Sequence, residues 1–157
     1  MELCNQEKTT RAPARSGRDA RRALERRDAE FDLNIPYISE IKLCVGAYLS
    51  GGVEKTLKIR DDGVLTEVKG LLSFDEVDGG GEVLNKSELL QSLSELHIGR
   101  WRSRYDLLRV GIFVCDGVYW SLEVCYSNGA RTRKFSGSNR FPDNFERLLK
   151  IFDLEMP

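Results

Sequence analysis

The sequence predicts an α+β fold, in which an antiparallel β-sheet is built from two three-stranded meanders, each followed by a helix (βββα–βββα). Apolar and polar residues alternate over several stretches, turn-forming residues separate these stretches, and two further segments repeat apolar residues at helical spacing. A basic helical arm precedes the sheet. We expect the arm over residues 1–34, partly disordered or helical, and a single domain over residues 35–157.

The arm is identified by its charge. Residues 8–27 carry Lys8 and seven arginines against Asp19 and Glu25, although the chain of 157 residues has a formal net charge of −1. The remaining body is therefore acidic, and a basic end on an acidic body is typical of an interaction arm. Residues 1–16 lack periodicity, whereas Ser16 to Phe31 is rich in Ala, Arg and Glu and is expected to be a helix that frays unless the body or a partner holds it.

The first meander begins after Pro36. Its first strand has an alternating apolar series, formed by Ile41, Leu43, Val45, Ala47 and Leu49. Turns are expected at residues 50–52 and 61–63, and in the second of them Gly63 supplies the positive φ that a hairpin turn needs. The third strand is expected at residues 64–72. Asn85 is the expected N-cap of a leucine-rich helix that stops at Gly99.

The second meander is expected to repeat this plan. Strands are predicted at residues 110–114, 118–126 and 131–135, with a hairpin turn at Asn128-Gly129. Pro142 is expected at an early position of the last helix. The apolar face of this helix comprises Phe141, Phe145, Leu148, Leu149 and Phe152.

The residues from Trp101 onward resemble a domain of small uncharacterised proteins from Gram-positive and gut bacteria. The similarity lies in Trp101, Tyr105, Asp116-Gly117, Trp120-Ser121-Leu122, Asn128-Gly129, Ser136-Gly137-Ser138-Asn139, Pro142 and Asn144-Phe145. It implies a bacterial origin, in a phage or mobile element, and transfers no catalytic residue. A basic arm before a small α+β body also resembles the layout of anti-CRISPR proteins, the phage-encoded inhibitors of CRISPR effector nucleases.

No set of residues in the sequence indicates catalysis, a cofactor or a metal. His97 is the only histidine, and it is expected to be partly exposed near the end of a helix. Cys4, Cys44, Cys115 and Cys125 are widely spaced, so we expect reduced thiols and no zinc site. No base stands near Cys115 in the sequence to activate it as a nucleophile. The chain has no apolar run of about 20 residues and no leader-like segment, so we expect a cytoplasmic protein that is not an enzyme and has no membrane partner.

The arginines of the arm are the leading candidates for binding phosphates. They are Arg11, Arg15, Arg18, Arg21, Arg22, Arg26 and Arg27. Arg102 and Arg104 alternate with Trp101 and Tyr105, as bases and aromatics do in single-strand binders, and residues 131–134 could extend a positive patch. The alternatives are a solvated arm with internal ion pairs, and aromatic residues that close the edge of the core.

We therefore expect a non-catalytic bacterial or phage accessory protein that binds a nucleic acid or nucleoprotein complex through its arm, most specifically an inhibitor of a CRISPR effector nuclease. The acidic body would offer a surface to a protein partner. The alternatives are a protein-interaction or structural module with a solubilising arm, and a small enzyme of unknown type.

Overall fold

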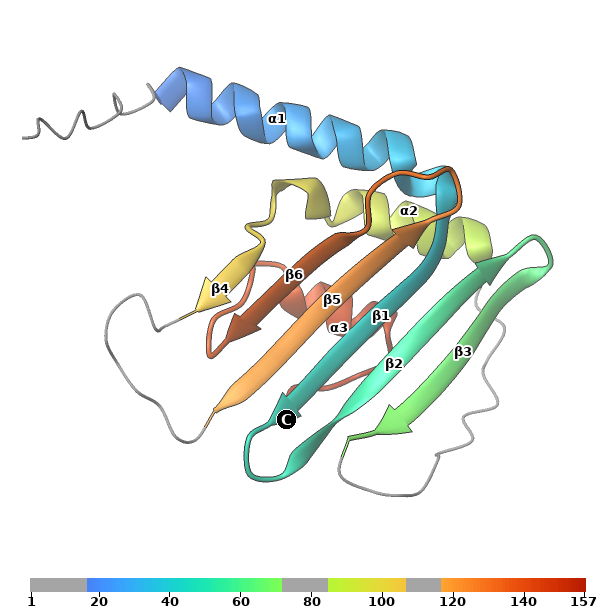
Figure 1. Cartoon of the computed structure of the whole chain (residues 1–157), viewed down its shortest axis with the longest axis vertical. Coiled ribbons are helices and arrows are strands. Elements are labelled where there is room, and N and C mark those ends of the chain that lie inside the picture. Colours follow the sequence, from blue (N-terminus) through green and yellow to red (C-terminus); the bar gives the residue numbers. More distant parts are fainter. Residues whose placement is uncertain (1–16, 72–84, 107–116) are drawn as a thin grey trace, which may run out of the picture.

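A computed structural model describes residues 17–71, 85–106 and 117–157, and Figure 1 shows one sheet with helices on one face and across one end. In chain order the elements are α1 (Gly17–Asn34), the 3-10 turn η1 (Ile35–Tyr37), β1 (Ile38–Ala47), β2 (Gly51–Arg60), β3 (Gly63–Gly70), α2 (Lys86–Glu95), the 3-10 turn η2 (Ile98–Arg100), β4 (Arg104–Asp106), β5 (Val118–Tyr126), β6 (Arg133–Ser138) and α3 (Phe145–Ile151). None of these helices is long and apolar enough to cross a membrane.

The sheet has six strands in the order β3-β2-β1-β5-β6-β4. The first meander forms as expected, because β1, β2 and β3 pair in sequence and antiparallel. β1 also pairs antiparallel with β5, with Leu43 opposite Leu122, so the first strand of the chain lies inside the sheet. Gly63 and Gly129 have positive φ values of 146° and 80°, the conformation expected for Gly63 and one that glycine adopts readily.

The α+β prediction is confirmed, and β5 and β6 pair antiparallel as predicted, but the plan of two antiparallel three-stranded meanders does not match the sheet exactly. β4 lies on the outer side of β6 and runs parallel to it, with Tyr105 opposite Gly137, so the sheet is mixed. Parallel neighbours need a long crossover, and here the crossover includes β5. The strand expected at residues 110–114 lies outside the described residues.

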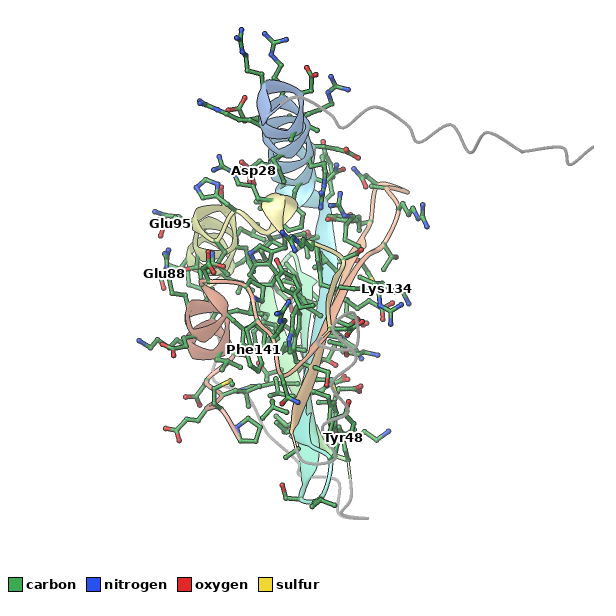
Figure 2. All side chains as sticks on the ribbon, turned by 90° about the vertical axis from the view of Figure 1, so that its left-hand side faces the viewer. Asp28, Tyr48, Glu88, Glu95, Lys134 and Phe141 are labelled. Carbon is green, nitrogen blue, oxygen red and sulfur yellow. The ribbon has the colours of Figure 1, made fainter. Side chains whose placement is uncertain are left out.

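One face of the sheet forms the core. The buried residues of β1, Ile41, Leu43 and Val45, point to the same side as Leu122 and Val124 of β5. Figure 2 shows α2 and α3 on this side and Lys134 of β6 on the other. Among the described residues, no helix packs on the opposite face, which carries polar residues such as Lys42, Glu123 and Lys134.

The ends of two helices differ from the prediction. Asn85 is the N-cap of α2, since its side chain accepts a hydrogen bond from the Ser87 amide at 2.9 Å. α2 nevertheless ends at Glu95 rather than at Gly99, because His97 adopts a left-handed conformation with φ of 49°. α3 begins at Phe145, three residues after Pro142, which is buried in the preceding connection.

Candidate nucleic-acid interface

The second half of α1 is fixed to the body at η2. Phe31 is 1% exposed and belongs to the core. A Cβ at Gly99 would lie 2.5 Å from Asp28 Cα and 2.6 Å from the Arg27 carbonyl oxygen, so only glycine permits this approach of helix and turn. Arg27 donates a hydrogen bond from Nη2 to the Trp101 carbonyl oxygen. α1 is therefore held by packing and hydrogen bonding rather than left to fray.

Asp28 joins α1 to two basic side chains of the body. Its carboxylate is buried, and Oδ2 accepts hydrogen bonds from Arg100 Nε at 2.6 Å and lies 2.9 Å from His97 Nδ1. Asp28 Oδ1 has no hydrogen-bond partner among the described residues. His97 is partly exposed as expected, with 54% of its side chain accessible, and it directs one ring nitrogen to this carboxylate. The cluster links α1 to the segment at η2, although Asp28 and His97 are 69 residues apart in the sequence.

The same cluster includes the one group of potential metal ligands among the described residues. Asp28, Asp32 and His97 each offer a ligand atom within 4.8 Å of the others. Arg100 already supplies a positive charge to the Asp28 carboxylate, so a divalent cation would have to displace it. We therefore interpret the cluster as a charge-compensated joint between α1 and η2.

The first half of α1 carries the arginines that the sequence singled out. Figure 1 shows the first turns of α1 extending beyond the edge of the sheet. Arg18, Arg22 and Arg26 are exposed and share one side of the helix, because they are spaced by four residues. None of the salt bridges within the described part of the chain involves these three arginines. We call these three residues the arginine stripe.

The other arginines of the arm differ. Arg21 pairs with Glu25 at 2.8 Å, and this hydrogen bond raises the pKa of the Arg21 guanidinium. Arg27 faces the body, as described above. Arg11 and Arg15 lie outside the described residues. The structure thus brings three of the seven predicted arginines together on one accessible side.

The ring of Trp101 packs in the core and is not available to stack on a nucleic-acid base. Trp101 is 5% exposed, packs edge-on against Trp120 and Phe135, and donates to Asn144 Oδ1 at 3.0 Å. The hydroxyl of Tyr105 accepts a hydrogen bond from the Arg102 amide at 3.1 Å.

The two basic residues of this segment are exposed. Arg104 pairs with Asp106 at 3.1 Å, whereas Arg102 borders a shallow depression of about 490 Å³ with His97 and Arg100. For Trp101, the alternative interpretation is therefore the correct one: this aromatic residue closes the edge of the core.

A larger cleft of about 660 Å³ separates α1 from the β5–β6 hairpin. It is lined by Glu30, Phe31 and Asn34 of α1, Tyr126 of β5, and residues 130–134 of the turn and β6. Asn128 Nδ2 donates to Asn34 Oδ1 at 2.9 Å and so ties the hairpin turn to the helix. Burial raises the pKa of Tyr126 to about 12, although Arg133 acts in the opposite direction. The sequence suggested residues 131–134 as a positive patch but gave no sign that Glu30 or Tyr126 would face them.

The cysteines of the described residues lie on the uncovered face of the sheet. Cys44 and Cys125 are free thiols, and burial raises the pKa of the Cys44 thiol, with a further contribution from Glu54. A raised pKa lowers the thiolate fraction and with it the reactivity. Cys4 and Cys115 lie outside the described residues, so the interpretation of Cys115 stays a prediction.

Comparison with protein-family models, curated proteins and solved structures finds no match to this chain.

Proposed function

We propose that the protein binds nucleic acid, free or within a nucleoprotein complex, through the arginine stripe of α1. The observation that carries this proposal is the contrast along α1: a well-anchored second half holds an arginine-bearing first half away from the body. An exposed helix segment of this charge gains little from its own body, whereas guanidinium groups pair well with phosphate oxygens. The anchor would limit the loss of conformational entropy on binding, because the helix is already formed.

The experiment compares two triple variants that remove the same charge. Arg18→Gln, Arg22→Gln and Arg26→Gln remove the stripe, and Arg60→Gln, Lys69→Gln and Lys150→Gln remove three exposed cations of β2, β3 and α3. Fluorescence anisotropy with labelled single-stranded and duplex oligonucleotides measures affinity between 50 and 200 mM salt. We expect the stripe variant to reduce the slope of log affinity against log salt by about 2–3 on duplex DNA, at about 0.9 per lost phosphate contact. Equal affinities of the two variants, or no binding by the unmodified chain, would refute the proposal.

Substitution is a cleaner test than truncation. Removing residues 1–30 would also delete Arg27 and Asp28, which hold α1 to the body. A truncated chain that fails to bind could therefore have lost its helix anchor rather than its phosphate contacts.

The narrowest form of the proposal is an inhibitor of a CRISPR effector nuclease. In that case the stripe would occupy a channel that normally holds nucleic acid, or contact the bound guide. A target-cleavage assay with purified effector, at increasing protein concentration, tests this form. Unchanged cleavage at saturating protein would exclude the effector tested.

A protein-interaction module is the second candidate function, and the uncovered sheet face favours it. Tyr48 and Tyr119 lie on this face with ring centroids 5.3 Å apart, and Tyr48 follows the end of β1 that is farther along the chain from α1. Under this alternative the stripe variant would keep its partner, and Tyr48→Ser with Tyr119→Ser would lose it.

A further inference from the structure

The cleft between α1 and the β5–β6 hairpin contains a cation, Arg133, that pairs with no carboxylate of the described residues. Arg133 is half-buried, and its position opposite Val124 turns it toward the core side of the sheet. Its guanidinium lies 5.8 Å from the centre of the Phe135 ring, and no salt bridge joins it to an acidic residue of the described chain. A partly desolvated cation without a counter-charge is costly, so an anionic ligand would be favoured here.

The basic residues next to Arg133 differ in whether they have a carboxylate partner. Lys134 also borders the cleft, but its ammonium group pairs with Glu123 at 2.9 Å on the uncovered face. Arg131 is exposed at the rim and, within the described residues, has no ion pair. Arg131 and Arg133 therefore bring two uncompensated positive charges to one wall.

The cleft also offers a neutral donor and an opposing carboxylate. With its pKa raised to about 12, the Tyr126 hydroxyl is protonated at neutral pH and can donate a hydrogen bond. Among the described residues, Glu30 on the facing wall is the only carboxylate that lines the cleft. The lining residues carry a net positive charge, and the carboxylate of Glu30 weakens the attraction of the cleft for anions.

The arginine stripe leads to this cleft. Arg26 and Glu30 are four residues apart on α1, so they lie one turn from each other on the same side of the helix. From Arg18 to Glu30 the helix rises about 18 Å, at about 1.5 Å per residue. A nucleic-acid strand bound along the arginine stripe would therefore reach the cleft within a few nucleotides.

We propose that this cleft binds a phosphodiester group of the nucleic acid that lies along the arginine stripe, with Arg131 and Arg133 as the charged contacts and Tyr126 as a neutral donor. This inference rests on the proposed function. It adds a second contact region, contributed by the hairpin rather than by the helix, and identifies its ligand as a backbone phosphate rather than a base.

The test compares Arg131→Gln with Arg133→Gln in one double variant against a control double variant, Arg60→Gln with Lys69→Gln. The probe is a fluorescein-labelled single-stranded oligonucleotide of 20 nucleotides. We expect the cleft variant to lose about tenfold in affinity near 100 mM salt and to reduce the salt slope by about 1.4, or 0.7 for each lost contact on a single strand. The control variant should keep the slope of the unmodified chain.

Two single substitutions sharpen this result. Glu30→Gln should raise the affinity about two- to fivefold, because it removes the carboxylate that faces the bound phosphate. Tyr126→Phe should lower the affinity by about two- to fivefold without changing the salt slope, because it removes a neutral donor. Circular dichroism and the thermal midpoint would show that each variant remains folded.

The outcomes separate the two proposals. If the stripe variant loses affinity while the cleft variant matches its control, the cleft inference fails and the proposed function stands. If Glu30→Gln weakens binding, the cleft does not receive an anion. If the unmodified chain binds no oligonucleotide, both proposals fail.

Discussion

The two halves of α1 differ in what they contact, although both are rich in charge. In the first half, residues 17–26, no side chain is buried. In the second half, Phe31 enters the core and Asp28 is buried against Arg100. Arg26 and Arg27 are adjacent in the sequence, yet within the described residues only Arg27 forms a hydrogen bond to the body, because successive residues point about 100° apart on a helix. Position relative to η2, rather than charge, decides which residues anchor the helix and which remain available.

The largest expected effect is the loss of the apolar anchor. Phe31→Ala should lower the free energy of unfolding by about 3–5 kcal/mol, because it leaves a cavity where the ring is buried. Leu24→Ala, in the first half, should cost less than about 1 kcal/mol, since Leu24 is 40% exposed. Urea denaturation measures both variants. Similar losses would show that the first half is packed as tightly as the second.

A smaller effect is expected where α1 approaches η2. Gly99→Ala introduces a Cβ that must push helix and turn apart, at a cost of about 1–3 kcal/mol. Gly17→Ala is the matched control, because a Cβ at Gly17 has nothing within 4 Å. The thermal midpoint distinguishes the two. An unchanged thermal midpoint for Gly99→Ala would mean that α1 and η2 can move apart without loss of stability.

The buried carboxylate should contribute less still. Asp28→Asn removes the negative charge that pairs with Arg100 and lies against His97. We expect a loss of about 1–2 kcal/mol in the free energy of unfolding, at the low end for a buried hydrogen-bonding group because both partners are about half exposed to water. Glu25→Gln, which removes the exposed partner of Arg21, should leave the denaturation midpoint unchanged. An equal response to the two substitutions would contradict the difference between the halves.

The smallest effect depends on pH. A tyrosine in the unfolded chain titrates near pH 10, whereas burial raises the pKa of Tyr126 to about 12. The folded state therefore favours the neutral phenol, and this contribution is complete below pH 10 and is lost as the pH rises from 10 to 12. Because the side chain is partly exposed, we expect a loss of about 1 kcal/mol. Denaturation at pH 9 and pH 11.5 should show a smaller decline for Tyr126→Phe than for the unmodified chain, and an identical decline would disprove this assignment.

Local signals predicted the parts of the fold that depend on neighbouring residues. The alternation through Ile41, Leu43 and Val45, the turn at Gly63 and the cap at Asn85 each involve a few consecutive positions, and each is present in the structure. The arginine stripe follows equally from the spacing of its residues along one helix.

The rest depends on contacts between distant segments. Neither strand has a sequence pattern that predicts the parallel pairing of Tyr105 with Gly137. The contact of Asp28 with His97 joins residues that are 69 positions apart. The cleft likewise requires α1 to lie beside a hairpin formed by residues about one hundred positions later in the chain. Such pairings are set by the packing of the whole sheet, so periodicity alone could not reveal them.

The interior position of β1 has a consequence for folding. Its two neighbours differ in how soon they become available, since β2 follows within a few residues but β5 begins only at Val118. Until β5 pairs with it, β1 has unpaired backbone N–H and C=O groups along one edge, next to apolar side chains. Such an edge can pair with a strand of another chain. A growing polypeptide that stops before Val118 should therefore be prone to aggregation, and closure of the sheet should be among the slower steps, because it joins segments so far apart.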